Sequence, residues 1–248
     1  MTSIELTAKT WESVWNQQAS VVSYNSNDKS MRINRGYISR YIKPSSSRFL
    51  EAGCGTARTS LDTALTHRQL DVTCVDITPS ALGIAKRLFK ENKAEGNFVC
   101  ADLRAMPFKD GTFDFIFSDG AIEHFEETEK AVSEIHRLLT HGGRTFITVP
   151  RISIPMLTIG QFQGNIPKIP HLEWIFEFIH RQVFKSSLMK NGFEYSFTRF
   201  QVSKLMTGFH YVDVGLFHGG LISKLCRLEL AVKLQSLLCC LIYACGEK

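Results

Sequence analysis

The sequence predicts an α/β protein with a doubly wound, mostly parallel sheet. Between residues 48 and 150, short apolar runs alternate with segments of helical periodicity, and a glycine-rich loop follows the first run. Strands that alternate with helices in this way are joined by right-handed crossovers, so the strands run parallel. In such a sheet, ligands bind at the carboxyl ends of the strands.

Composition supports an ordinary globular chain and excludes several classes. The 248 residues are 44% hydrophobic and 21% charged, with a net charge of +5, which fits neither disorder nor an obligatory nucleic-acid partner. The seven cysteines form no CxxC pair, so we expect reduced thiols and no metal site. The N-terminus lacks the apolar core of a signal peptide. The longest uncharged stretch near the C-terminus, 234–246, is shorter than the roughly 20 residues of a membrane span. We expect a cytoplasmic protein without a transmembrane span.

Residues 1–47 are predicted to form an N-terminal helical cap. Helices are expected over 4–17 and 28–41, and a Pro-Ser turn cluster ends this region. Trp11 and Trp15 are four residues apart and share one helix face. We interpret them as a packed helix face rather than as a cage for a substrate.

Residues 48–150 are predicted to form the core that binds a cofactor. Strands are expected over 48–52, 70–75, 97–100, 112–118 and 144–149, and helices over 59–66, 79–93 and 127–139. Pro79 lies near the start of its helix, the glycines at 142 and 143 stop the last helix, and Pro150 stops the last strand.

Residues 151–248 have a different texture and are predicted to complete the same sheet. The segment 151–170 is rich in proline and glycine and is expected to form a loop or lid. Helices are expected over 173–190 and 219–238, and strands over 193–202 and 239–244. Together with the apolar segment 205–230, the lid would shape a substrate pocket.

The strongest functional signal is the loop after the first strand. Gly53 and Gly55 let the backbone turn sharply and approach a ligand. A glycine fingerprint alone fits nicotinamide, flavin and other adenosine cofactors. Glu51 precedes the first glycine by two residues and would repel a pyrophosphate, whereas it would attract an ammonium or a sulfonium group.

Acidic residues also end the next three strands. Asp76 is placed to accept hydrogen bonds from both hydroxyls of a ribose, and Asp102 could accept one from an adenine amino group. Asp119 ends the fourth strand. Acids at four neighbouring strand ends suit a ligand that is cationic and carries hydroxyl and amino groups.

These motifs resemble those of class I S-adenosylmethionine-dependent methyltransferases, in the small-molecule group that includes quinone C-methyltransferases. The matching stretches are LEAGCGTA, VDITPSAL, CADLRAMPFKDGTFDFIFSDGAIEHF and EIHRLLTHGGRTFITVP. Ala57 replaces the third glycine, a small departure. The resemblance implies S-adenosylmethionine as cofactor, S-adenosylhomocysteine as product, and a seven-stranded sheet that ends in an antiparallel hairpin of the last two strands.

The resemblance also implies a map of the site. The methionine end of the cofactor would be lined by Glu51, Gly53, Cys54 and Gly55. Asp76 would hold the ribose, Ile77 would pack on the adenine, and the adenine would also meet Asp102 and Leu103. Beside the sulfonium would lie Ser118, Asp119 and Gly120, and Tyr24 and Tyr37 would close over the cofactor.

Glu123 and His124 follow the fourth strand, where a methyl acceptor would approach. His124 is the first choice for a general base, and the competing interpretation is that it caps or packs the next turn. In the related cyclopropane fatty-acid synthases, the resemblance would give Glu123 a carbonate-binding role, an interpretation we rank lower.

We therefore expect direct, in-line methyl transfer to a small, apolar or amphipathic acceptor, with no nucleic-acid partner. Three alternatives stay open, and one is lipid modification like that of the cyclopropane synthases. A nicotinamide oxidoreductase shares the fold, although Glu51 and Asp102 argue against it. A cofactor-binding protein without catalysis would bind the cofactor and turn over no acceptor.

Overall fold

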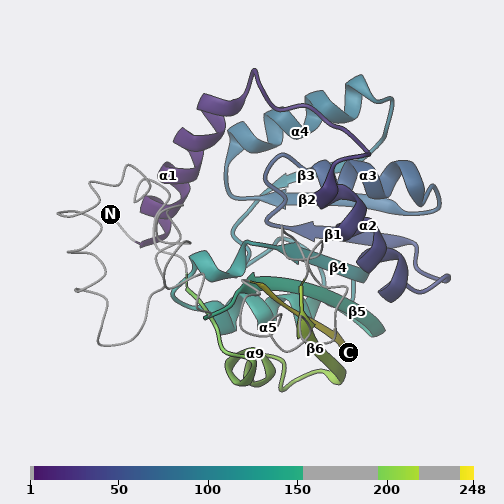
Figure 1. Cartoon of the computed structure of the whole chain (residues 1–248), viewed down its shortest axis with the longest axis vertical. Helices are drawn as coiled ribbons and strands as arrows, with labels where there is room; N and C mark the ends of the chain where they lie inside the picture. The colour runs from purple at the N-terminus through teal and green to yellow at the C-terminus, as the bar shows by residue number, and fades with distance from the viewer. Residues whose placement is uncertain (1–2, 153–194, 218–240) are drawn as a thin grey trace, which may run out of the picture.

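The computed structural model describes residues 3–152, 195–217 and 241–248. Its seven strands form one sheet in the order β3-β2-β1-β4-β5-β7-β6 (Figure 1). The strands are β1 (Arg48–Ala52), β2 (Asp71–Asp76), β3 (Asn97–Cys100), β4 (Phe113–Asp119), β5 (Leu139–Pro150), β6 (His210–Leu216) and β7 (Leu241–Glu247). The strands β1 to β5 pair in parallel with one another, whereas β7 is antiparallel to both β5 and β6. The predicted doubly wound, seven-stranded sheet with an antiparallel end is confirmed.

Helices cover both faces of the sheet. They are α1 (Ser3–Gln18), α2 (Lys29–Tyr41), α3 (Arg58–Thr66), α4 (Pro79–Glu91), the 3-10 helix η1 (Ile122–His124), α5 (Thr128–Leu138) and α9 (Arg199–Leu205). One buried cluster joins the sheet to α2, α3 and α4, and a second joins it to α5 and α9. The helices α5 and α9 therefore lie on the face opposite α2, α3 and α4.

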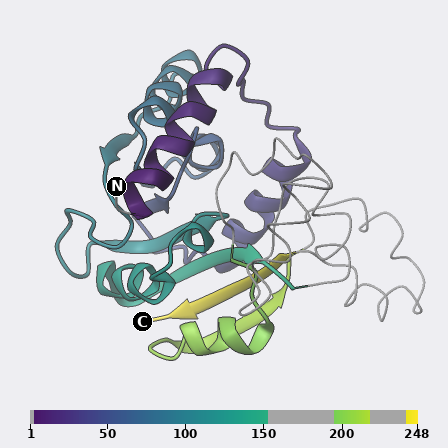
Figure 2. The ribbon, with the colours of Figure 1, turned by 90° about the vertical axis from the view of Figure 1, so that its left-hand side faces the viewer.

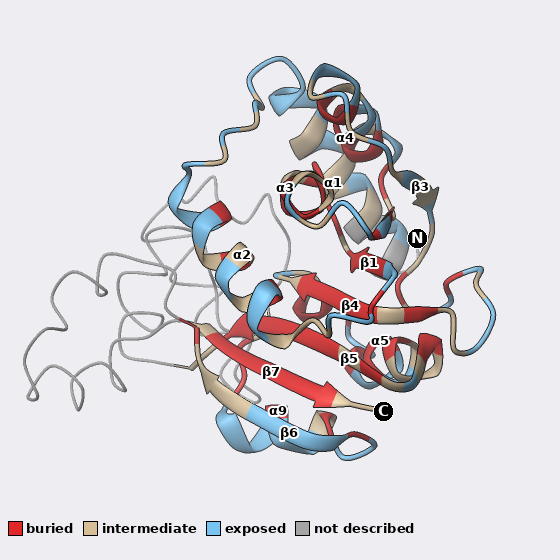
Figure 3. Cartoon of the chain, turned by 90° about the vertical axis from the view of Figure 1, so that its right-hand side faces the viewer, coloured by how far each residue is buried: buried red, intermediate tan, exposed pale blue. Residues whose placement is uncertain are grey.

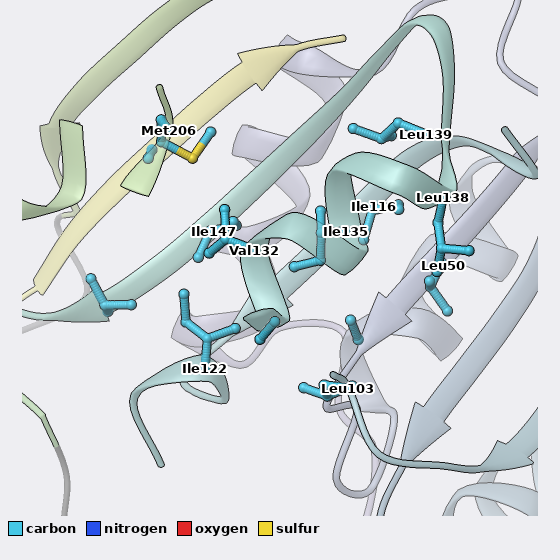
Figure 4. Close-up of a cluster of buried hydrophobic side chains, with 14 of the residues drawn as sticks. Leu50, Leu103, Ile116, Ile122, Val132, Ile135, Leu138, Leu139, Ile147 and Met206 are labelled. Carbon is cyan, nitrogen blue, oxygen red and sulfur yellow. The ribbon is translucent and has the colours of Figure 1, made fainter. Parts of the chain in front are cut away.

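The central strand β4 explains why both faces need cover. Phe115 and Phe117 belong to the cluster under α3 and α4, whereas Ile116 belongs to the cluster under α5. All three are completely buried, because successive side chains of a strand point to opposite faces. Figure 4 shows Ile135 of α5 close to Ile116 on the second face.

The helix α1 packs against α4, away from β5 and β7 (Figures 1 and 2). The guanidinium of Arg87, on α4, donates hydrogen bonds to the carbonyls of Ala19 and Val22, at 3.0 and 2.9 Å, just after α1 ends. At the other end of α4, the Glu12 carboxylate accepts a hydrogen bond from the Ser80 amide at 3.3 Å. These polar contacts fix α1 beside the first turns of α4.

The C-terminal region differs from the prediction. The predicted strand 193–202 is wrong: Phe197 makes one bridge to Arg151, and α9 begins two residues later. Thr198 and Gln201 form a capping box, each side chain bonding the other's backbone amide, which starts a helix here. The sheet is completed instead by β6, which was not predicted and lies exposed along the edge (Figure 3).

Two strand boundaries also shift. The strand β5 begins at Leu139 rather than at residue 144, because Gly142 adopts a φ of +73° and lets the chain stay in the sheet. The last strand, Leu241–Glu247, ends three residues beyond the predicted end at residue 244. The predicted helices 173–190 and 219–238 lie outside the described residues, as does the loop from residue 153 to 170. In the described part of the chain, no helix combines the length and apolar character needed to cross a bilayer.

Candidate functional site

A cavity opens at the carboxyl ends of β1 to β4. Its described lining consists of Trp11, Trp15, Gly53, Gly55, Asp76, Ile77, Leu103, Gly120, Ala121, His124 and Phe125. These residues come from α1 and from the segments that follow four parallel strands, so the topology assembles the cavity from distant parts of the sequence. The lining is mostly apolar, and none of its described side chains is a lysine or arginine.

Gly53 brings the end of β1 against two neighbouring segments. Its φ is +77°, and a Cβ added there would lie 2.3 Å from the Cβ of Ala121 and 3.3 Å from Leu103. The amides of Gly53 and Cys54 both donate to the Val75 carbonyl, at 2.9 and 2.8 Å. Only a residue without a side chain permits this close approach.

Gly55 connects the loop to the second strand and to α1. Its amide donates to Oδ2 of Asp76 at 2.8 Å, and a Cβ added there would lie 3.1 Å from Trp15. Two residues later, Ala57 stands where a third glycine was expected and also has a positive φ, of 53°, just before α3. Alanine therefore adopts here the left-handed conformation that glycine adopts at lower cost.

Asp76 reaches the cavity with its carboxylate held by neutral donors. Its Oδ1 accepts hydrogen bonds from the Thr78 amide at 2.9 Å and the Thr78 hydroxyl at 2.7 Å. Burial raises the pKa of Asp76, and the hydrogen bonds from Thr78 and Gly55 oppose this shift. Because Oδ2 accepts one hydrogen bond, it keeps the capacity to accept a second from a ligand hydroxyl.

Glu51 lies behind the glycine loop rather than in the cavity lining. Its Oε2 accepts hydrogen bonds from the amide and the hydroxyl of Ser60, in the first turn of α3. Burial raises the pKa of Glu51 to about 8, hydrogen bonds from Ser60 lower it, and the charges of Asp119 and Asp76 raise it further. Glu51 can therefore act on a cation in the cavity through its field, without direct contact.

Asp102 is turned toward a cation of the protein itself. Its Oδ2 accepts a hydrogen bond from Nη2 of Arg104 at 2.9 Å, and its Oδ1 accepts one from the Arg104 amide at 2.9 Å. Arg104 also pairs with Glu127 at 2.8 Å. The structure therefore does not bring the Asp102 carboxylate to the cavity lining with Asp76.

Asp119 and Ser118 support the site from behind. The Asp119 carboxylate accepts a hydrogen bond from Nδ2 of Asn34, on α2, at 3.1 Å, and a second from the Thr148 hydroxyl. The completely buried Ser118 donates to the Ala52 carbonyl at 2.9 Å. These bonds fix β4 to its neighbours, and Gly120, the next residue, lines the cavity.

Three other predicted residues lie outside the described lining. The Tyr24 hydroxyl donates to Asp62 at 2.7 Å. The Tyr37 ring packs on Phe146, Phe217 and Tyr243. Cys54 is buried, and burial raises the pKa of its thiol.

The structure adds residues that sequence reasoning did not place in the site. Trp11 and Trp15 stack with centroids 5.6 Å apart, and Trp15 packs against the buried cluster, as expected of a packed helix face. Both rings also line the cavity, where the sequence interpretation did not place them. Ala121 and Phe125 flank the predicted catalytic pair and also line it. His124 lies in the lining, whereas the Glu123 side chain is buried below it. The tryptophan spacing was the available signal, but it did not show which face α1 presents to the core.

Comparison with known proteins gives the same assignment for the core. A family model described as a methyltransferase domain matches residues 50–147. The demethylmenaquinone methyltransferase of Thermus thermophilus is 30% identical over 117 residues, which cover 47% of this chain and 53% of that protein. The chain thus spans about half the length of this curated relative.

Solved structures agree on the fold. The phosphoethanolamine N-methyltransferase 2 of Haemonchus contortus, in complex with phosphomonomethylethanolamine and S-adenosylhomocysteine, has a TM-score of 0.60 at 19% identity and covers 88% of this chain and 52% of its own. The 4+2 cyclase SpnF has a TM-score of 0.65 at 16% identity and covers 100% of this chain and 97% of its own. Residues 50–147 therefore match a methyltransferase domain in sequence, and the solved structures agree with its fold.

Proposed function

We propose that this protein transfers a methyl group from S-adenosylmethionine directly to a small, apolar or amphipathic molecule. The observation that carries the proposal is the cavity at the strand ends, where Gly53, Gly55 and Asp76 face the segment Gly120–Phe125. The sequence composition leads us to expect that it acts in the cytoplasm and on a free small molecule rather than on nucleic acid.

Each part of the cavity suits one part of this cofactor. Asp76 would accept hydrogen bonds from the ribose hydroxyls, and the apolar Ile77 and Leu103 would hold the adenine. The loop at Gly53 and Gly55, which lines the cavity, would hold the methionine end. S-adenosylmethionine supplies an activated methyl group on a positively charged sulfur, so the protein's tasks are alignment and exclusion of water.

The electrostatics of the site suit a cation. Glu51, Asp76 and Asp119 are held by neutral donors, namely Ser60, Thr78, the Gly55 amide, Asn34 and Thr148. Burial is the main cause of the raised pKa of Glu51, and repulsion from the charges of Asp119 and Asp76 raises this pKa further. A sulfonium and an ammonium would relieve this repulsion.

His124 is the candidate to remove a proton from the acceptor. It lies in the lining beside Gly120 and Ala121, and an imidazole exchanges protons near neutral pH. The remaining described walls on this side, Trp11 and Phe125, are aromatic. They support an apolar acceptor, because burial of an anionic one would require a cation in the cavity.

Two measurements test the proposal. Isothermal titration should give tight binding of S-adenosylhomocysteine and none of a nicotinamide dinucleotide. Incubation with methyl-labelled S-adenosylmethionine and a panel of quinols, phenols and lipid precursors should then label at least one acceptor, and His124→Gln should slow that transfer. Binding of the nicotinamide cofactor alone would overturn the assignment. Cofactor binding with no labelled acceptor would favour the alternative of a non-catalytic binding protein.

A further inference from the structure

We infer that Trp11 is a positioning residue, which holds the imidazole of His124 at the acceptor end of the cavity and is itself positioned from the glycine loop through Trp15. The inference rests on the proposed function for the site but concerns residues of α1 that the methyltransferase domain match does not reach. Its physical basis is a continuous series of ring contacts across the cavity.

The first contact joins α1 to the residue proposed as the base. The ring centroids of Trp11 and His124 are 5.0 Å apart, with the planes at 69°. This edge-to-face arrangement is the favourable geometry for two aromatic rings. Both rings also line the cavity, so the contact is made where an acceptor would lie.

The second contact joins Trp11 to its neighbour one turn later. Trp15 stacks on Trp11 at 5.6 Å and 23°, since residues four apart in a helix lie on one face. The six-membered ring of Trp15 then lies over Gly55, where an added Cβ would be 3.1 to 3.8 Å from three ring atoms. The loop glycine therefore provides the surface against which the tryptophan pair packs.

The third observation is that α1 is held in place independently of these rings. Glu12 bonds the Ser80 amide at the start of α4, and Arg87 bonds the carbonyls of Ala19 and Val22 beyond the end of α1. These contacts set the position of the helix along α4. A change at Trp11 should therefore alter the imidazole contact without releasing α1.

His124 has local reasons to depend on such a partner. It is the last residue of the single-turn helix η1 and is followed by extended backbone at Phe125. A 3-10 turn has poorer hydrogen-bond geometry than an α-helix. The Trp11 ring supplies a contact from across the cavity, which narrows the orientations open to the imidazole.

The arrangement also relates cofactor binding to His124. A ligand on the glycine loop would contact the surface on which Trp15 packs. If the ligand displaces the Trp15 ring, the Trp11 ring stacked on it would move as well and would change its contact with His124. We therefore expect binding of S-adenosylhomocysteine to change the environment of the imidazole, although the two sites of contact lie at different strand ends.

The test follows the His124 ring by NMR in protein labelled at histidine, with His124→Gln used to assign its signal among the eight histidines. Trp11→Leu removes the aromatic edge and should shift the His124 ring resonances and speed modification of His124 by diethyl pyrocarbonate several-fold. Trp11→Phe keeps an aromatic partner and should restore most of both signals. Trp15→Leu should weaken the response of His124 to S-adenosylhomocysteine.

Two controls separate the possible failures. Far-ultraviolet circular dichroism and the unfolding midpoint confirm that each variant is folded, and Val14→Ala, on α1 but outside the described lining, should leave His124 unchanged. If Trp11→Leu is folded, binds S-adenosylhomocysteine and leaves the His124 resonances and modification rate as in the wild type, the inference is overturned. If the wild type does not bind S-adenosylhomocysteine, the proposed function fails instead, whatever the rings do.

Discussion

Asp76 and Asp102 both lie at the carboxyl ends of neighbouring strands, yet their surroundings differ. Asp76 lines the cavity and accepts hydrogen bonds only from neutral groups, the Gly55 amide and Thr78. Asp102 faces the guanidinium of Arg104 at 2.9 Å. The comparison shows that an acid at a strand end serves a ligand only if its hydrogen-bond donors leave its charge uncompensated.

Glu51 and Asp119 resemble Asp76 in their donors but not in their position. Both are held by neutral side chains, and neither carboxylate is part of the described lining. Their contribution is long-range, through an interior where charges are poorly screened. Asp76 is therefore in position to contact a ligand, whereas Glu51 and Asp119 would act on it only through long-range electrostatics.

The largest effect is expected when the charge of Asp76, the acid in position to contact the ligand, is removed. Asp76→Asn should weaken binding of S-adenosylhomocysteine by about 100-fold, because hydrogen bonds to a charged acceptor are worth roughly 1.5–3 kcal/mol each. Isothermal titration measures the change. Asp71→Asn, at the exposed start of the same strand, is the matched control and should bind normally. Equal affinity of Asp76→Asn and the wild type would remove the ribose assignment.

The next effect concerns the glycine loop, which bonds Asp76 through the Gly55 amide. Gly53→Ala would place a Cβ 2.3 Å from Ala121 in a conformation that alanine rarely adopts. We expect a loss of about 1–3 kcal/mol in the free energy of unfolding, measured by urea denaturation, together with loss of cofactor binding. Gly83→Ala, in α4 with no atom within 4 Å of the added Cβ, is the control. Its stability should be unchanged or increased by up to about 1 kcal/mol. A fully stable Gly53→Ala would contradict the close approach.

Glu51 should release a proton when the positively charged cofactor binds. Its pKa of about 8 in the empty protein means that it is mostly protonated at pH 7, and a bound cation would favour the carboxylate. Binding of S-adenosylmethionine should therefore release a proton and strengthen as the pH rises toward 8, with no further gain above it. Titrations in two buffers of different ionisation enthalpy measure the proton count. Glu51→Gln should remove the release, and an unchanged count in this variant would assign it to another group.

The smallest effect is expected for substitution of Asp102. Asp102→Asn should change the affinity for S-adenosylhomocysteine by less than about threefold, because the carboxylate is already paired with Arg104 and is absent from the described lining. The same titration measures it. A loss comparable to that of Asp76→Asn would mean that Asp102 turns away from Arg104 when the cofactor binds.

Local patterns predicted the part of the site that local geometry determines. The glycine loop and Asp76, which local patterns indicated because sharp turns and strand ends leave signals within a few residues, lie in the described lining. Ile77 and Leu103, which the family resemblance implied, lie there as well. The orientation of Asp102 was not identified. Its carboxylate pairs with Arg104, which also pairs with Glu127, and the sequence does not show that these three side chains meet.

Long-range placement accounts for what the sequence did not reveal. Periodicity gave the shared face of Trp11 and Trp15, but the contacts of α1 with Ser80 and Arg87 decide that this face lines the cavity. The segment after Tyr195 was misjudged because its apolar residues suit a strand as well as a helix, and the capping box at Thr198 decides between them.

The place of β7 in the sheet has a consequence for folding kinetics. It pairs Arg144 with Glu247 and also provides the strand on which β6 docks, so β6 has no place in the sheet until a segment that follows it in the sequence has paired. Contacts of such high sequence separation slow folding. We expect the parallel strands β1 to β4 to pair first and the antiparallel strands at the end of the sheet to pair last. A nascent chain would then expose the edge of β5 until residues 241–247 are available.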